Sequence, residues 1–168
     1  MGQYNLALVA SAIVAGLAVL AFLAWKSRAA RQAKLFTAPA ENLETSRLLF
    51  GPVSARYVAT TTTADPLERI TAHGLGMRGS CDVNVYENGM VINRKGETSI
   101  ALEKSAIRGV GLTNAAIDRV VETDGLISIE WSRDGHNLST YLRVTSNADK
   151  AQLVEQTNLL LSKGQTND

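Results

Sequence analysis

Residues 126–144 read LISIEWSRDGHNLSTYLRV, two alternating segments joined by Asp134-Gly135. One face of each segment is formed by every second residue and is mostly apolar. These residues are Ile127, Ile129 and Trp131 in the first segment, and Leu138, Thr140, Leu142 and Val144 in the second. Successive side chains of a strand point to opposite faces, so each segment has one face that can be buried. Because an Asp-Gly pair suits the positive φ values of a type I′ turn, the stretch predicts an antiparallel hairpin on a core.

Further strand signals lie on the N-terminal side of this hairpin. Asn88-Gly89 separates CDVNVYE from MVINR and predicts a second hairpin with a type I′ turn. The run VSARYVATTTT (53–63) is rich in β-branched residues and predicts a strand. The segments 98–113 and 115–123 supply about two more. Roughly seven short strands are therefore expected.

Two capping patterns predict helices. Ser146 precedes Asp149 by three residues and starts an amphipathic run that continues to Ser162. Asp65-Pro66-Leu67-Glu68 predicts a short helical turn near 66–73. Periodicity supports a mainly-β domain, a small antiparallel barrel or sandwich with a C-terminal helix. About seven strands capped by one C-terminal helix describe the pleckstrin-homology-like (PH-like) architecture, with two roughly orthogonal sheets.

An apolar segment of very different composition precedes this domain. Residues 6–25 read LALVASAIVAGLAVLAFLAW, and no Lys, Arg, Asp or Glu occurs before Lys26. Twenty helical residues at about 1.5 Å each cross the ~30 Å hydrocarbon core of a bilayer. A signal peptide would have a basic start, a shorter apolar run and a small-residue cleavage site. The sequence therefore predicts an uncleaved N-terminal transmembrane helix, with the lipid bilayer as its partner.

Four basic residues follow the apolar run, with no acid among them: Lys26, Arg28, Arg31 and Lys34. Basic residues flanking a span stay on the cytoplasmic side, so these four are membrane and topology residues. They could also attract anionic lipid headgroups. The prediction is a single-pass protein of the cell (plasma) membrane, N-out and C-in, with a cytoplasmic C-terminal domain. The span itself contains no ionisable residue that could serve a channel or carrier mechanism.

The charge balance limits which classes of molecule are expected as partners. Lys and Arg number 17 against 16 Asp and Glu, a net charge of +1. The basic residues after the span account for the excess, and the remainder from 35 to 168 is mildly acidic at −3. This composition argues against nucleic acid. The predicted organisation is a tail and transmembrane helix (1–25), a basic juxtamembrane segment and linker ending at the Gly51-Pro52 break (26–52), and the PH-like domain with its C-terminal helix and tail (53–168).

One glycine-rich loop could bind an anion or a partner. Residues 74–79 read GLGMRG and match the G-x-G-x-x-G pattern of dinucleotide-binding folds. The pattern needs a following helix whose N-terminus holds the pyrophosphate, and here a strand pattern follows. The expectation is a structural loop, with a residual anion- or partner-binding role. The candidates for that role are His73, Gly74, Gly76, Arg78 and Gly79.

The other chemical signals are isolated residues. Only Arg69 and Arg78 lie near the loop, interleaved with acidic side chains, which argues against a phosphoinositide site. His73 and His136 are far apart, and neither forms a metal-binding motif with the single cysteine, Cys81. One cysteine permits no internal disulfide, which is consistent with a reducing compartment. The sequence therefore predicts no catalytic, metal or cofactor site, no cofactor and no enzyme activity.

A family resemblance adds to this interpretation. RYVATTTTADPLERITAHGLGMRGSCDVNVYENGMVINR (56–94) closely resembles the matching stretch of short actinobacterial single-span membrane proteins with a C-terminal PH-like domain. Their most specific common part is YVATTT together with HGLG and the following Arg-Gly. These proteins are often labelled export, transporter or membrane proteins. The resemblance implies an architecture and a membrane location, and it carries over no catalytic residue.

Three functional hypotheses follow. The first is a membrane-anchored interaction or scaffold protein that presents its PH-like domain to a protein partner at the cytoplasmic face. The second is an accessory subunit of a transport or export assembly, in which the small residues Ala12 and Gly16 seat another helix. The third is an enzyme or anion-binding domain that uses the Gly74–Gly79 loop.

Overall fold

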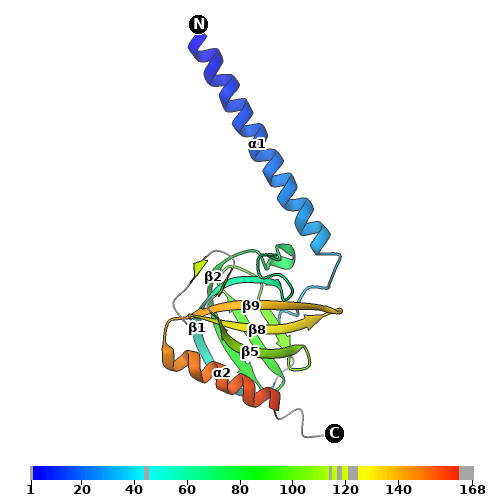
Figure 1. Cartoon of the computed structure of the whole chain (residues 1–168), viewed down its shortest axis with the longest axis vertical. Coiled ribbons are helices and arrows are strands. Elements are labelled where there is room, and N and C mark those ends of the chain that lie inside the picture. The colour runs from blue at the N-terminus through cyan, green and yellow to red at the C-terminus, as the bar shows by residue number, and fades with distance from the viewer. Residues whose placement is uncertain (1, 44–45, 114, 117–118, 121–124, 163–168) are drawn as a thin grey trace.

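The computed structural model describes residues 2–43, 46–113, 115–116, 119–120 and 125–162. A long helix, α1 (Gly2–Gln32), leaves one end of a β domain, and α2 (Asn147–Ser162) packs at the other end (Figure 1). The side chains of residues 7–28 are exposed along α1. The segment Ala7–Gln32 has a mean hydropathy of 2.6 in its most apolar window and is long and apolar enough to cross a membrane.

Seven antiparallel strands form one sheet in the order β4-β3-β2-β1-β9-β8-β5. They are β1 (Leu48–Thr62), β2 (Gly79–Tyr86), β3 (Gly89–Arg94), β4 (Ile100–Glu103), β5 (Ile107–Thr113), β8 (Leu126–Arg133) and β9 (His136–Val144). A separate pair is β6 (Ala115–Ala116) and β7 (Arg119–Val120), and η1 (Ala72–Gly74) is a short 3-10 helix. The described elements confirm the predicted PH-like set of about seven strands and a C-terminal helix. The strands predicted in 115–123 lie partly outside the described residues.

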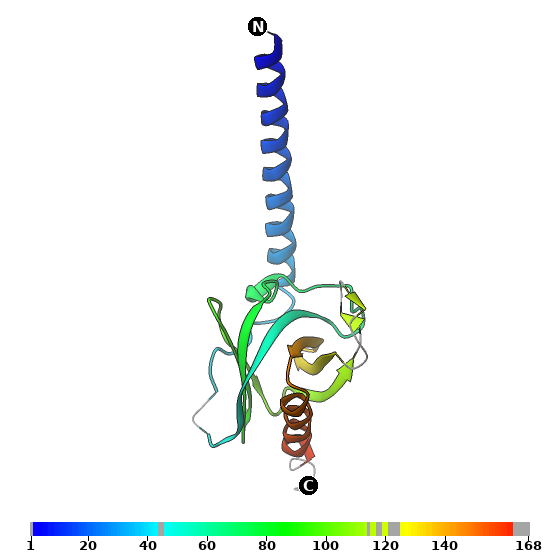
Figure 2. The ribbon, with the colours of Figure 1, turned by 90° about the vertical axis from the view of Figure 1, so that its left-hand side faces the viewer.

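The longest strand connects the two halves of the sheet. β1 pairs with β2 from Leu48 to Tyr57 and with β9 from Ala55 to Thr62. Its register shifts after Leu48, after Phe50 and again after Tyr57. Such bulges bend a strand and increase its twist. β1 accordingly curves through the domain (Figure 2), and the two halves of the sheet enclose one core.

The core follows the alternation expected from the sequence. Ile127, Ile129 and Trp131 of β8 are at most 1% exposed. The predicted N-terminal cap of the C-terminal helix is confirmed, because the Asp149 N–H donates to Ser146 Oγ over 3.2 Å. α2 buries a single stripe of side chains in the domain: Leu153, Thr157 and Leu160. One amphipathic helix therefore closes the core, as predicted.

The two hairpin turns differ from each other. Asp134 (φ 49°) and Gly135 (φ 80°) both have positive φ, as predicted for a type I′ turn. In the other hairpin the central residues are Glu87 and Asn88, and Gly89 already belongs to β3. The predicted turn placement is therefore wrong by one residue. A side chain at Gly89 would collide with the carbonyl oxygen of Leu102 in β4, which explains the glycine at this position.

Two local expectations are wrong. β1 begins at Leu48 and continues through the cis peptide Gly51–Pro52, where the sequence predicted the end of a linker. The predicted helical turn near 66–73 does not form as such, and η1 is confined to Ala72–Gly74. The Ile70 N–H donates to the Thr60 carbonyl over 2.9 Å, so the preceding backbone is drawn into pairing with the end of β1.

A chain of buried hydrogen bonds crosses the core. Trp131 Nε1 donates to Thr140 Oγ1 over 3.0 Å, and that hydroxyl lies 2.8 Å from Thr60 Oγ1. Thr60 Oγ1 lies 2.7 Å from the Tyr57 hydroxyl, which donates to the Leu75 carbonyl over 2.8 Å. Burial raises the pKa of Tyr57 to about 12, so its proton stays available for this bond. This series of hydrogen bonds connects β8, β9 and β1 to the loop after η1.

Replacing Thr140 by Val should lower the free energy of unfolding by about 1–3 kcal/mol, because the Trp131 N–H loses its acceptor inside the core. Thermal and urea unfolding of the full chain in detergent would measure the change. The matched control is Thr145→Val, at an exposed threonine directly after β9. Equal stability of the two variants would contradict a structural role for the buried chain.

Candidate functional site

The predicted glycine-rich loop is turned toward the domain. Leu75 is fully buried, and the Gly74 carbonyl accepts a hydrogen bond from Arg94 Nη1 over 2.8 Å. The amides of Leu75 and Met77 donate to the carbonyls of Ala72 and Gly74. His73 and Gly74 have positive φ values of 54° and 71°, which turn the chain sharply there. These contacts assign the loop a structural role.

The remaining candidates in the loop differ in their surroundings. A Cβ at Gly76 would lie 3.1 Å from Thr71 Cα, so the glycine permits close backbone packing. Gly79 opens β2, and a Cβ there would have nothing within 4 Å. Arg78 is exposed just before that strand. The predicted anion-binding role of these residues stays a prediction.

The end of α1 is bound to the same loop region. Gln32 is 5% exposed, and its Nε2 donates to the Arg69 carbonyl over 3.0 Å. Its Oε1 accepts hydrogen bonds from the Thr71 N–H over 2.7 Å and from Thr71 Oγ1 over 2.9 Å. Residues 32–38 contact residues 69–73 and also the β8–β9 turn. We call this set of contacts the clamp.

Phe36 is the apolar part of the clamp. It is 4% exposed, and its ring contacts the imidazoles of His73 and His136 with centroids 5.2 and 6.3 Å away. His73 Nε2 lies at hydrogen-bond distance, 2.9 Å, from the Phe36 carbonyl oxygen. His73, predicted from sequence as a binding residue, thus holds the segment that follows α1.

The β8–β9 turn completes the clamp. The Thr37 N–H donates to Asp134 Oδ2 over 2.6 Å, and Arg133 donates to Thr37 Oγ1 and to the Ala38 carbonyl, each over 3.1 Å. The hydrogen bonds from Thr37 hold the pKa of Asp134 below its ordinary value. The carboxylate is therefore charged at neutral pH, and this contact is lost only as the pH falls through that lowered pKa.

The chain after the clamp covers one edge of the sheet. The Ala101 N–H of β4 donates to the Ala40 carbonyl over 2.8 Å, which forms an isolated bridge beside β4. At the opposite edge, β5 pairs only with β8 among the described strands. Leu112 of β5 is 44% exposed, and α2 packs beside this strand. Partly buried apolar side chains of both elements border the core there: Val110, Val154 and Leu161.

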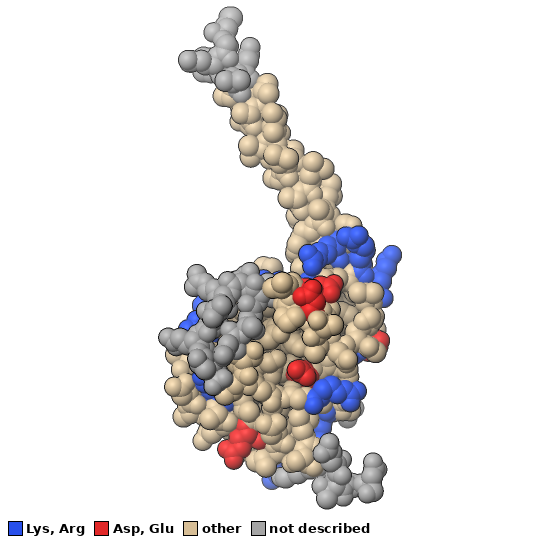
Figure 3. Space-filling model, in the orientation of Figure 1, with Lys and Arg blue, Asp and Glu red and all other residues tan. Residues whose placement is uncertain are grey.

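The four predicted topology residues are exposed around the end of α1. Lys26, Arg28 and Arg31 lie in its last turns, and Lys34 follows it. In Figure 3, basic side chains gather where α1 meets the domain, whereas the described part of α1 farther from the domain is free of charge. The structure therefore groups these cations at the boundary between the apolar helix and the domain.

The single cysteine is enclosed by the fold. Cys81 is 1% exposed, and burial raises the pKa of its thiol to about 11. A buried thiol with a raised pKa is a poor nucleophile. Within the described ranges, no group of three or more His, Cys, Asp and Glu side chains gathers in a way that could hold a metal ion.

Apart from His73, sequence reasoning missed the residues that make the clamp and hold the loop. Gln32 carries no signal of its role, because one polar residue at a helix end is ordinary in any chain. Arg94 is 6% exposed, lies 5.1 Å from the Tyr57 ring centroid and donates twice to the Thr98 carbonyl. A buried arginine satisfied by backbone carbonyls leaves no pattern in the sequence.

Comparisons with known proteins agree with the fold. A family described as "Bacterial PH domain-like" matches residues 33–158. No curated protein matches the chain.

Fourteen chains of solved structures match it. "The 8S snRNP Assembly Intermediate" contains a chain with 10% identity and a TM-score of 0.47, with 74% of this chain and 89% of that one covered. The "Structure of Inner Membrane Complex (IMC) Sub-compartment Protein 3 (ISP3) from Toxoplasma gondii" has 11% identity and a TM-score of 0.41, covering 66% and 77%. "Vav1 inhibited by an allosteric inhibitor: Vav1 inhibitors block GEF activity" has 12% identity and a TM-score of 0.42, covering 82% of this chain and 33% of that one.

Replacing Gln32 by Leu should loosen the clamp, because the Thr71 N–H and the Arg69 carbonyl lose their partner. Tryptic cleavage after Arg31 and Lys34 of the full chain in lipid nanodiscs should then accelerate by about fivefold or more, since local opening limits proteolysis of a bound segment. Gln152→Leu, at an exposed position of α2, is the control. Unchanged cleavage of the Gln32 variant would show that the clamp does not order this segment.

Proposed function

This chain belongs to the bacterial PH domain-like family, and we propose that it is a non-enzymatic, single-pass membrane protein whose PH-like domain binds a protein partner. In this proposal α1 is an uncleaved span of the plasma membrane. The domain lies at the cytoplasmic face as an interaction or scaffold module. The clamp is the observation that carries the proposal, because it joins the apolar helix to the folded domain through side chains from both.

The clamp supports a fixed presentation of the domain. Gln32, the last residue of α1, and Phe36, four residues later, are both buried, although the apolar residues of α1 are exposed. A mobile tether would need neither contact, because Gly-, Ser- or Pro-rich segments connect a span and a domain without binding either. A held juxtamembrane segment keeps the same surfaces of the domain turned toward and away from the bilayer. Such an arrangement suits a module that positions a partner at the membrane.

The proposed orientation rests on the basic residues around the end of α1. Lys26, Arg28, Arg31 and Lys34 follow the span on the side of the domain, and basic flanks stay in the cytoplasm. Cys81 cannot report this orientation by thiol labelling, since it is buried and its pKa is raised. A cysteine introduced at an exposed position is needed.

Cysteine labelling with a membrane-impermeant reagent tests the topology. In a Cys81→Ala background, Glu97→Cys should be labelled only after the cells are permeabilised, because Glu97 is exposed in the β3–β4 turn and would face the cytoplasm. Asn5→Cys, before the span, should be labelled in intact cells. The reverse pattern would overturn the orientation, and recovery of the chain from the soluble fraction would overturn the anchor.

The β5 edge is the surface proposed for the partner. One side of this strand has no described strand partner, and half-exposed apolar side chains of β5 and α2 border it. An extended segment can add to such an edge through main-chain hydrogen bonds, while its side chains occupy the apolar margin. The opposite edge, β4, is already covered by Ala40. The proposed occupant is therefore an extended, partly apolar segment of another protein.

A pair of charge substitutions tests this surface. Leu112→Glu should reduce recovery of a specific partner from mild-detergent membranes by about tenfold, since a carboxylate replaces an apolar contact at the edge. Leu48→Glu is the matched control, because Leu48 is 46% exposed and Leu112 is 44% exposed. Quantitative mass spectrometry of the tagged full chain gives the ratio. Equal recovery with both variants would exclude the β5 edge, and no enriched protein with the unmodified chain would contradict the proposed function.

A further inference from the structure

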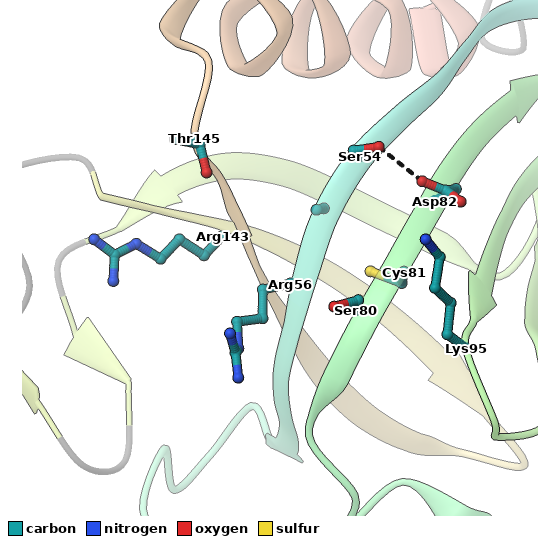
Figure 4. A pocket seen from close by; sticks show the side chains of 9 residues that line it. Ser54, Arg56, Ser80, Cys81, Asp82, Lys95, Arg143 and Thr145 are labelled. Carbon is teal, nitrogen blue, oxygen red and sulfur yellow. Dashed lines mark hydrogen bonds between the residues drawn. The ribbon is translucent and has the colours of Figure 1, made fainter.

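A basic pocket lies on the sheet, beginning at Ser80, which directly follows the glycine-rich loop. It has a volume of about 440 Å³ and is lined by residues of β1, β2 and the end of β9 (Figure 4). Arg56 and Arg143 line it from neighbouring strands with their side chains extending in different directions, and Lys95, at the end of β3, lines its other side. None of these residues belongs to the clamp or to the β5 edge.

The strand register places these cations in one row. Arg56 of β1 lies directly opposite Arg143 of β9 on one side and opposite Ser80 of β2 on the other. The row continues to Lys95, whose N–H donates to the Ser80 carbonyl over 2.9 Å. Neighbouring strands are about 4.8 Å apart, so the backbones of Arg143, Arg56 and Ser80 are spaced at regular intervals across the sheet, and Lys95 follows at the end of β3.

The charges of the row are not balanced by the part of the fold that the structure describes. Like charges directly opposite each other across two strands repel. Among the described residues, no carboxylate forms an ion pair with Arg56, Arg143 or Lys95, and no side-chain hydrogen bond engages them. Asp82 is the one acidic residue that lines the pocket, and it accepts a hydrogen bond from Ser54 Oγ over 2.9 Å. Three cations and one carboxylate leave a local charge of +2.

The surrounding groups suit a phosphate group. Arginine presents a planar array of donors that matches phosphate oxygens bidentately, and lysine adds a point charge. The hydroxyls of Ser80 and Thr145 line the same pocket. A phosphate monoester carries about −1.5 to −2 at neutral pH, close to the unbalanced charge of the row.

We propose that this pocket binds a soluble ligand carrying one or two phosphate groups, with Arg56 and Arg143 as its main ligands. The position of the pocket favours a soluble source over a lipid headgroup. It lies on the flank of the domain, next to Thr145, which leads into α2 at the end opposite α1. The clamp holds α1 to the other end, at η1. The pocket thus extends from Ser80, which follows the glycine-rich loop, along the flank of the domain to Thr145 beside α2.

Calorimetric titration of the full chain with inorganic pyrophosphate tests the proposal, in nanodiscs of phosphatidylcholine. Binding should be saturable, and the double variant Arg56→Gln/Arg143→Gln should weaken it by about tenfold or more, because both charge-assisted contacts are removed. Arg108→Gln is the control, since Arg108 is an exposed arginine on β5 whose Nε donates to Ser132. It should bind as the unmodified chain does.

Thermal unfolding supplies a readout independent of the titration. Pyrophosphate should raise the unfolding midpoint of the unmodified chain more than sodium chloride of equal ionic strength does, and this rise should vanish in the double variant. Without ligand, the double variant should be no less stable than the unmodified chain, because a like-charge pair is removed. A destabilised double variant would instead indicate a structural role for the two arginines and overturn the assignment.

Three other outcomes also overturn the proposal. The first is an equal loss of pyrophosphate binding in Arg108→Gln, which would mean unspecific attraction by surface charge. The second is the absence of saturable binding. The third is binding to vesicles containing phosphatidylinositol phosphate without binding to pyrophosphate, which would make the ligand a lipid. The β5-edge variant Leu112→Glu should bind pyrophosphate normally, because the two surfaces are distinct.

Discussion

The fold depends on a chain of hydrogen bonds in its core. The chain runs from the Trp131 indole through the hydroxyls of Thr140, Thr60 and Tyr57 to the carbonyl of Leu75. Each polar group would cost free energy if it were buried without a partner. Together they bind strands from both halves of the sheet and hold the loop that follows η1. That loop has little regular structure of its own, so the core determines its position.

The segment directly before that loop, residues 69–73, binds the end of α1. Arg69, Thr71 and His73 bind Gln32 and Phe36, and the β8–β9 turn binds Thr37. Hydrogen bonds of the core, the loop and the clamp thus follow one another from Trp131 to the apolar helix. This continuity connects the stability of the domain to its placement relative to α1. It is the physical basis for the proposed membrane-positioned interaction module.

The two basic features of the molecule illustrate how sequence patterns and spatial patterns differ. The juxtamembrane cations are neighbours in the sequence, so they are visible without a structure. Arg56, Lys95 and Arg143 are far apart in the sequence and meet only because β1 lies between β2 and β9. The G-x-G-x-x-G match is the opposite case, a pattern that is visible in the sequence but does not form the site that it suggests. Its residues are contiguous, yet the chain uses Gly74 and Gly76 for a turn and for close packing against Thr71.

The amino-acid sequence by itself determined the apolar helix, the alternating strands, the Asp134-Gly135 turn and the capped C-terminal helix. Each of these follows from residues close together in the chain, through hydrophobic periodicity, turn chemistry or capping. Local signals also led to errors. Gly51–Pro52 suggested a break where β1 continues, and the cap at Asp65 suggested a helix where the backbone pairs with β1.

Only the tertiary structure decided the clamp, the burial of Arg94 and the row of cations across β9, β1 and β2. Most of their partners are separated by many residues, and a single sequence does not record which strand lies beside which. The strand order depends on how the bulged β1 divides its pairing between β2 and β9. That division is set by the packing of the whole core, so these contacts exist only after the chain has folded.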